Sequence, residues 1–150
     1  MTKIRLITLI EAPVGVCFDL ARSVDVHLDS LTHTKECVVA GRKSGLCQEG
    51  DMITWEAKHF GIRQHLTVGI THVDYPNSFE DEMIKGAFRR MHHRHEFVFT
   101  DAVTTMKDYF TYEVPFGLVG SLFDSLILKR YMTNLLIIRN SHIKQLAETR

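Results

Sequence analysis

The stretch Val114–Ala147, VPFGLVGSLFDSLILKRYMTNLLIIRNSHIKQLA, decides the fold. Pro115 and Gly117 end the last strand pattern at the start of this stretch. Apolar residues then recur every three or four positions, which is the spacing of one helix face. A helix from Leu118 to Ala147 would be about 45 Å long at 1.5 Å per residue. The predicted inner stripe is Val119, Leu122, Phe123, Leu126, Ile127, Tyr131, Leu135, Ile138 and His142, of which Leu122, Phe123 and Leu126 are expected to reach the interior.

The chain before this helix has the pattern of antiparallel strands joined by short turns, such as Tyr75–Ser78. Two short helical patterns, Val14–Ala21 and Asp25–Leu31, follow the first strand. Such a sheet needs a cover for one face, and the long helix supplies it. The sequence therefore predicts a single α+β domain over residues 1–150, with a curved antiparallel sheet wrapped around the C-terminal helix. The predicted strands are 4–10, 38–39, 52–60, 62–74, 79–85, 88–100 and 104–114.

Composition excludes several classes of protein. Eighteen basic residues balance eighteen acidic ones, so the chain has no overall field that would attract nucleic acid. Three cysteines without C-x-x-C spacing form neither a disulfide framework nor a zinc knuckle. The longest aliphatic run near the C-terminus, Leu135–Ile138, is far shorter than the roughly 20 residues of a membrane span. We expect a cytoplasmic protein without membrane insertion, and the sequence leaves a homodimer open.

Strand parity indicates which side chains point inward, because successive residues of a strand alternate between its faces. The apolar faces of the predicted strands also carry a few ionisable groups. Buried carboxylates and imidazoles need partners or water, so these groups are expected to pair or to meet a cavity. The expected inward ionisable residues are His59, Asp81, His93, His95 and Asp108.

The hairpin formed by the last two strands predicts a polar contact. Counting outward from a turn near Ala102 places Asp108 beside His95 or diagonal to it, on the same face. The pair could simply fix strand register, or it could anchor a ligand among apolar walls. The residues expected to line that pocket are Trp55, His59, Met83, Met91, His93, His95, Phe97, Met106, Asp108, Phe110, Leu122, Phe123 and Leu126.

Seven strings in this order resemble a bacterial branch of the START and polyketide-cyclase-like superfamily, SRPBCC. They begin with VHLDS at 26–30, GD at 50–51 with TWEAKHFG at 54–61, and FEDEM at 79–83. GAF at 86–88, HRHEF at 93–97, TMKD at 105–108 and VPFG at 114–117 complete the set. The resemblance implies a helix-grip fold with a cavity between sheet and helix. Met91 departs from the pattern, in which an aromatic residue is more usual.

The resemblance implies no single activity, because members of the superfamily bind lipids, sterols, plant hormones or polyketides and some are cyclases or aromatases. Binding of a small, largely apolar molecule is the first hypothesis, since no nucleophile motif or phosphate loop occurs. The alternative is a cyclase, dehydratase or aromatase with His93, His95 and Asp108 as acid–base candidates.

A metal site is the weakest hypothesis from the sequence. Within His92-His93-x-His95, only His93 and His95 share a strand face, so Asp108 or His59 would have to complete a ligand set. We therefore expect neither a metal nor a cofactor.

Overall fold

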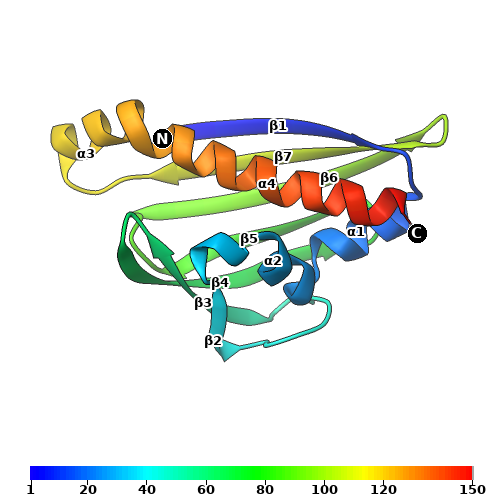
Figure 1. Cartoon of the computed structure of the whole chain (residues 1–150), viewed down its shortest axis with the longest axis horizontal. Coiled ribbons are helices and arrows are strands. Elements are labelled where there is room, and N and C mark those ends of the chain that lie inside the picture. The colour runs from blue at the N-terminus through cyan, green and yellow to red at the C-terminus, as the bar shows by residue number, and fades with distance from the viewer. Residues whose placement is uncertain (150) are drawn as a thin grey trace.

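The computed structural model describes residues 1–149, and its framework is a seven-stranded antiparallel sheet in the order β1-β7-β6-β5-β4-β3-β2 (Figure 1). The first strand of the chain thus pairs with the last, and the other strands follow one another as a meander. The bounds are β1 Thr2–Ile10, β2 Cys37–Gly41, β3 Met52–His59, β4 Ile62–Asp74, β5 Ser78–Lys85, β6 Arg90–Thr100 and β7 Val103–Glu113.

Helices from both ends of the chain cover one face of this sheet (Figure 1). Near the N-terminus these are α1, Val14–Ala21, α2, Val24–Ser30, and the short 3-10 turn η1, Thr32–Thr34. The C-terminal helix comprises α3, Gly117–Phe123, a π-helical turn η2, Asp124–Leu128, and α4, Lys129–Glu148. The sequence prediction of a curved antiparallel sheet, two short helices after β1 and a long C-terminal helix is confirmed.

The core consists of two apolar clusters along the covered face. One gathers around Trp55, Met91, Phe110 and Leu136. The other lies where α1 meets the C-terminal end of α4, and there Phe18 packs its ring 5.1 Å from that of Phe97. Two residues predicted to line the ligand pocket, Phe97 and Met106, belong to this second cluster.

The predicted inner stripe of the C-terminal helix is wrong over its first turns. The side chains of Leu122, Phe123 and Leu126 are 61%, 41% and 68% exposed, because α3 overhangs the end of the sheet (Figure 1). The buried residues of this overhang are Gly120 and Asp124 instead. Beyond it the buried positions are Leu135, Leu136, Arg139, Asn140, Ile143 and Ala147, whereas Ile138 is exposed.

Two contacts explain why small and polar residues face inward at the overhang. A side chain at Gly120 would collide with the backbone, since an added Cβ would lie 1.8 Å from the carbonyl oxygen of Pro115. The carboxylate of Asp124 accepts hydrogen bonds from the hydroxyls of Thr2 and Tyr112. The helix is thereby attached to β1 and β7 through a buried polar contact rather than through apolar packing.

Candidate functional site

Three adjacent strands bring a cluster of ionisable side chains together on the covered face. In the β6–β7 pairing His95 lies opposite Asp108, and in the β5–β6 pairing His93 lies opposite Asp81. All four residues face the helices, so the predicted approach of His93, His95 and Asp108 is confirmed. Asp81 joins them from the third strand.

Asp108 is the most enclosed member of the cluster, with no exposed surface. Its Oδ1 accepts a 2.7 Å hydrogen bond from Nε2 of His93, and its Oδ2 accepts one of the same length from Nδ2 of Asn140. Nδ1 of His95 lies 3.3 Å from Oδ1, and the Arg139 guanidinium lies 3.6 Å from it. The carboxylate therefore connects β6 and β7 to helix α4.

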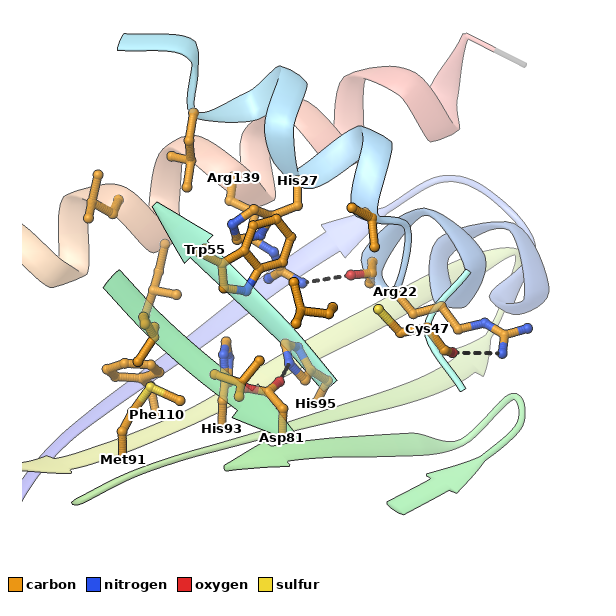
Figure 2. A pocket seen from close by; sticks show the side chains of 18 of the residues that line it. Arg22, His27, Cys47, Trp55, Asp81, Met91, His93, His95, Phe110 and Arg139 are labelled. Atoms are coloured by element: carbon orange, nitrogen blue, oxygen red, sulfur yellow. Dashed lines mark hydrogen bonds and ion pairs between the residues drawn. The ribbon is translucent and has the colours of Figure 1, made fainter. Parts of the chain in front are cut away.

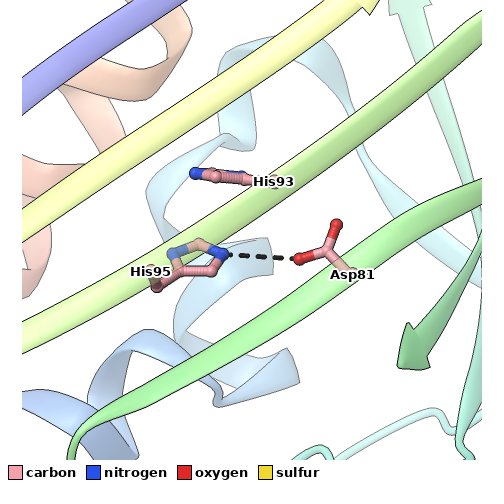
Figure 3. A group of neighbouring side chains, drawn as sticks. All are labelled: Asp81, His93 and His95. Carbon is pink, nitrogen blue, oxygen red and sulfur yellow. Dashed lines mark hydrogen bonds and ion pairs between the residues drawn. The ribbon is translucent and has the colours of Figure 1, made fainter. Parts of the chain in front are cut away.

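His95 lies between two carboxylates. Its Nε2 is 3.3 Å from Oδ2 of Asp81 (Figure 3), whereas its other ring nitrogen, Nδ1, is the one that faces Asp108. The His93 ring packs against it with centroids 3.8 Å apart. A neutral imidazole carries one N–H, so His95 can donate to only one of its two acidic neighbours.

The pKa values in the cluster are moved by burial and by these contacts. Burial, with the neighbouring His95, lowers the pKa of His93 to about 4, so this imidazole is neutral at pH 7. Because Asp108 can only accept, the proton of neutral His93 is on Nε2. Burial alone would raise the pKa of Asp108, but the hydrogen bond from His93 and the adjacent His95 imidazole hold it well below its usual range. Burial would also raise the pKa of Asp81, but the hydrogen bond with His95 and the nearby His93 lower it.

A cavity of about 170 Å³, the inner chamber, opens above this cluster (Figure 2). Its floor carries Asp81, His93 and His95, and its other walls are largely apolar side chains of the sheet, of the α1–α2 region and of α4, with the charged side chains of Arg22, Glu36 and Arg139 among them. Asp108 lies beneath the floor and does not line the chamber, while Met83, Phe97, Met106, Leu122 and Leu126 also lie outside it. The pocket candidates that do line it are Trp55, His59, Met91, His93, His95 and Phe110.

A second cavity of about 270 Å³, the outer chamber, adjoins the first beneath the overhanging helix. Phe123, exposed on one side, forms part of its wall. His59 and Tyr131 close it on another side, with Nδ1 of His59 2.6 Å from the Tyr131 hydroxyl. Burial lowers the pKa of His59 and raises that of Tyr131. The two chambers share the walls Glu36, Trp55, His59, Leu66, Phe88 and Met132.

Sequence reasoning missed two members of the site, Arg139 and Asn140. Both are buried on α4, and the Arg139 guanidinium also donates to the carbonyl oxygen of Ala21 at 3.0 Å. The available signal was their place between Leu136 and Ile143, in the stripe that packs on the sheet. Polar residues at such helix positions need buried partners, and Asp108 is one.

The chain is similar in fold to several solved structures. A Thermus thermophilus protein, TTHA0849, superposes with a TM-score of 0.73 at 20% identity, over 95% of this chain and 97% of that one. A START superfamily protein from Mycobacterium smegmatis gives 0.72 at 12% identity, over 96% and 98%. This chain has the helix-grip fold. The di-domain ARO/CYC protein StfQ from the steffimycin biosynthetic pathway gives 0.79 at 10% identity, covering 99% of this chain and 51% of StfQ.

At the level of sequence, no family model matches the chain, and no curated protein matches it. Among residues 1–149, no helix combines the length and the apolar character that a bilayer crossing requires.

Proposed function

We propose that this protein binds a small, elongated and largely apolar molecule that extends through both chambers. The observation that carries the proposal is the pair of adjoining cavities, which have apolar walls and a polar floor. Ligand pockets commonly measure about 300–1,000 Å³, and neither chamber reaches that range alone. The combined volume of the two chambers falls within that range. We therefore expect the ligand to extend from one chamber into the other, past the side chains that line both.

The polar end of the ligand belongs at the floor of the inner chamber. Asp81, His93 and His95 are the ionisable groups there, and the lone pair on Nδ1 of neutral His93 can accept a hydrogen bond from a ligand. The apolar part of the ligand then occupies the outer chamber, where Ala57, Phe88 and Val114 contribute to the wall. A few polar groups that orient an otherwise apolar molecule are typical of such sites.

Trp55 offers a direct measurement, because it is the single tryptophan of the chain and lies in the wall that both chambers share. We expect titration with a fluorescent fatty acid to quench its emission saturably. Extraction of the purified protein followed by mass spectrometry would identify any molecule retained from the expression host.

The test compares the same change, valine to phenylalanine, at a position inside the outer chamber and at an exposed position. Val114→Phe fills the outer chamber and should weaken binding of the fatty acid at least tenfold, whereas Val98→Phe, on an exposed part of β6, should leave it unchanged. Thermal unfolding of both variants would verify that they are folded. Equal affinities for the two variants, or no saturable quenching of Trp55, would refute the proposal.

An enzyme remains the second candidate, because His95 is held between two carboxylates and also faces the chamber. A carboxylate that orients an imidazole is the usual arrangement for general acid–base catalysis. The likeness to the ARO/CYC protein StfQ supports this candidate through its fold alone. Turnover of an aromatic polyketide substrate that is lost in His95→Gln, while the fatty acid still binds, would establish it.

A further inference from the structure

We infer that Asp81, His93 and His95 bind one divalent transition-metal ion at the floor of the inner chamber, with Asp108 orienting the imidazole of His93. One ligand atom from each of the three residues lies within 4.8 Å of the others. The inference does not require the apolar ligand, but the ion would take Nδ1 of His93, the atom proposed above as an acceptor for that ligand, and would itself meet the ligand's polar end.

The separation of Asp81 from His95 suits an ion better than a direct hydrogen bond. Two ligands about 2.0–2.1 Å from a tetrahedral ion are about 3.3 Å apart. Nε2 of His95 and Oδ2 of Asp81 are 3.3 Å apart (Figure 3), whereas a charge-assisted hydrogen bond measures about 2.7–2.9 Å. The two atoms are therefore spaced as ligands of a shared ion.

Asp108 sets the ring of His93 in the orientation that metal binding requires. It accepts the Nε2 proton of His93 at 2.7 Å, which leaves Nδ1 of that ring for an ion. Histidines that bind metals almost always donate their other N–H to a carboxylate, carbonyl or water, and His93 has this arrangement. Nδ1 of His95 lies 3.3 Å from the same carboxylate without a hydrogen bond, and Nε2 of His95 is directed toward Asp81.

The charges around the floor favour a cation. Asp81 and Asp108 carry two negative charges, and Arg139 is the positive side chain in contact with Asp108. The guanidinium also donates to Ala21 and Asn140, so it is committed to α1 and α4. The two carboxylates are thus buried with a single guanidinium in contact, and an additional cation would offset the cost of burying them.

The ligand set also indicates the kind of ion. Two imidazole nitrogens and one carboxylate oxygen suit zinc or iron(II), whereas magnesium and calcium prefer oxygen ligands. The three residues line the inner chamber, so the remaining coordination positions face the cavity. Three protein ligands with an open position are typical of a reactive ion rather than a structural one. The ion would therefore be available to the polar end of a bound molecule.

The test is titration of chelator-stripped protein with zinc chloride, followed by isothermal calorimetry, and with cobalt chloride, followed by visible absorption. We expect one ion per chain and an intense cobalt spectrum of low coordination number. Asp81→Asn and His95→Gln should each weaken zinc binding at least about tenfold, and Asp108→Asn by about 10- to 100-fold. The control is His72→Gln, since His72 lies on β4 outside both chambers and half exposed, and its zinc affinity should equal that of the wild type.

Absence of saturable zinc binding by the folded wild-type chain would overturn the inference, and so would binding that survives both Asp81→Asn and His95→Gln. Imidazole NMR gives a second measurement, since zinc should shift the ring resonances of His93 and His95 and leave those of His72 in place. Zinc that leaves the rings of His93 and His95 unshifted would also overturn the inference, because it would bind elsewhere or not at all. Titration of the metal-free protein with the fluorescent fatty acid separates failure of this site from failure of the apolar-ligand proposal.

Discussion

The two halves of the C-terminal helix differ in whether their apolar side chains are buried. The outer half, α3 with η2, exposes Leu118, Leu122 and Leu126 and buries Asp124. The inner half, α4, buries Arg139 as well as leucines and isoleucine. The difference follows from what each half faces: the outer half overhangs the sheet, and the inner half lies over the ionisable cluster of β5–β7 (Figure 1). Hydrophobicity along this helix therefore does not report burial.

Both halves are nevertheless attached to the sheet by a buried carboxylate. Asp124 accepts from Thr2 and Tyr112 at the outer end, while Asp108 accepts from Asn140 at the inner end. Apolar packing alone would let a helix slide along a sheet, since it is non-directional. The two polar attachments fix its position, and the chambers lie between them.

The largest expected effect comes from removing the buried cation of the inner half. Arg139→Met keeps much of the side-chain volume but removes the cation 3.6 Å from Asp108 and the guanidinium that donates to the carbonyl oxygen of Ala21. Breaking one side of a buried charge cluster typically costs about 3–5 kcal/mol, so we expect a loss of that size in urea unfolding. Arg130→Met is the matched control, because Arg130 is exposed near the start of α4, and its effect should stay within about 0.5 kcal/mol. Equal losses would abolish the contrast between the inner attachment and the exposed helix surface.

Acid should weaken the inner attachment through His93. The folded pKa of about 4 lies below the ordinary value of 6.5, so between these values the unfolded chain binds a proton that the folded chain does not. Stability should therefore fall as the pH falls from 6.5 to 4, by about 3 kcal/mol at about 1.4 kcal/mol per pH unit. The urea midpoint measured across this range would show the loss. Its dependence on pH should be much weaker in His93→Gln than in the wild type, and in His72→Gln it should equal that of the wild type. A variant at position 93 that retained the wild-type slope would assign the acid sensitivity to other groups.

A pair of leucine–asparagine substitutions sharpens the comparison further. Asn140→Leu removes the 2.7 Å hydrogen bond to Asp108 and should destabilise the fold by about 1.5–3 kcal/mol. The reverse change at the overhang, Leu122→Asn, places a polar side chain at an exposed position and should change stability by less than about 0.5 kcal/mol. Chemical denaturation of both variants measures the difference. A stability gain in Asn140→Leu would mean that the asparagine contributes nothing to holding Asp108.

The smallest effect is expected at the junction of the two halves. Tyr131→Phe deletes the 2.6 Å contact with His59 while it keeps the aromatic ring against Phe60. A partly buried neutral hydrogen bond is worth about 1 kcal/mol, so the melting temperature should fall by only a few degrees. Release of a bound fatty acid, followed in a stopped-flow experiment, should become faster because this wall of the outer chamber is less firmly held. Unchanged release would place the exit elsewhere.

Strand parity was enough to predict the floor of the site from the sequence. Parity placed His93, His95 and Asp108 on one face, and His95 pairs with Asp108 within the one residue of register that the count from Ala102 left open, because Thr100 pairs with Val103 at the turn. Asp81 was also expected to point inward, although its place beside His95 depends on the β5–β6 pairing, for which no turn length gave a count.

The sequence predicted the C-terminal helix less completely than it predicted the floor of the site. Its apolar spacing identified a helix but not the part of it that has a sheet beneath, so Leu122 and Leu126 were wrongly assigned to the interior. The assignment of Phe97 and Met106 to the pocket failed for a related reason, since parity indicates a face and not the place along it. Both residues fill the end of the face that α1 covers, beyond the inner chamber.

The pairing of β1 with β7 also has a consequence for how the chain is made. Ile4 pairs with Phe110, roughly a hundred residues later, and closing so long a loop delays formation of the contact. During synthesis β1 leaves the ribosome first, yet its partner strand is translated only after the rest of the meander. Ile4 and Ile10, the apolar side chains of β1 that are buried in the folded protein, therefore remain unpacked until most of the chain has emerged. A nascent chain that stalls before β7 is a substrate for chaperones that bind exposed apolar segments, and hairpins of β3 to β6 are the parts of the sheet that can form before β7 is made.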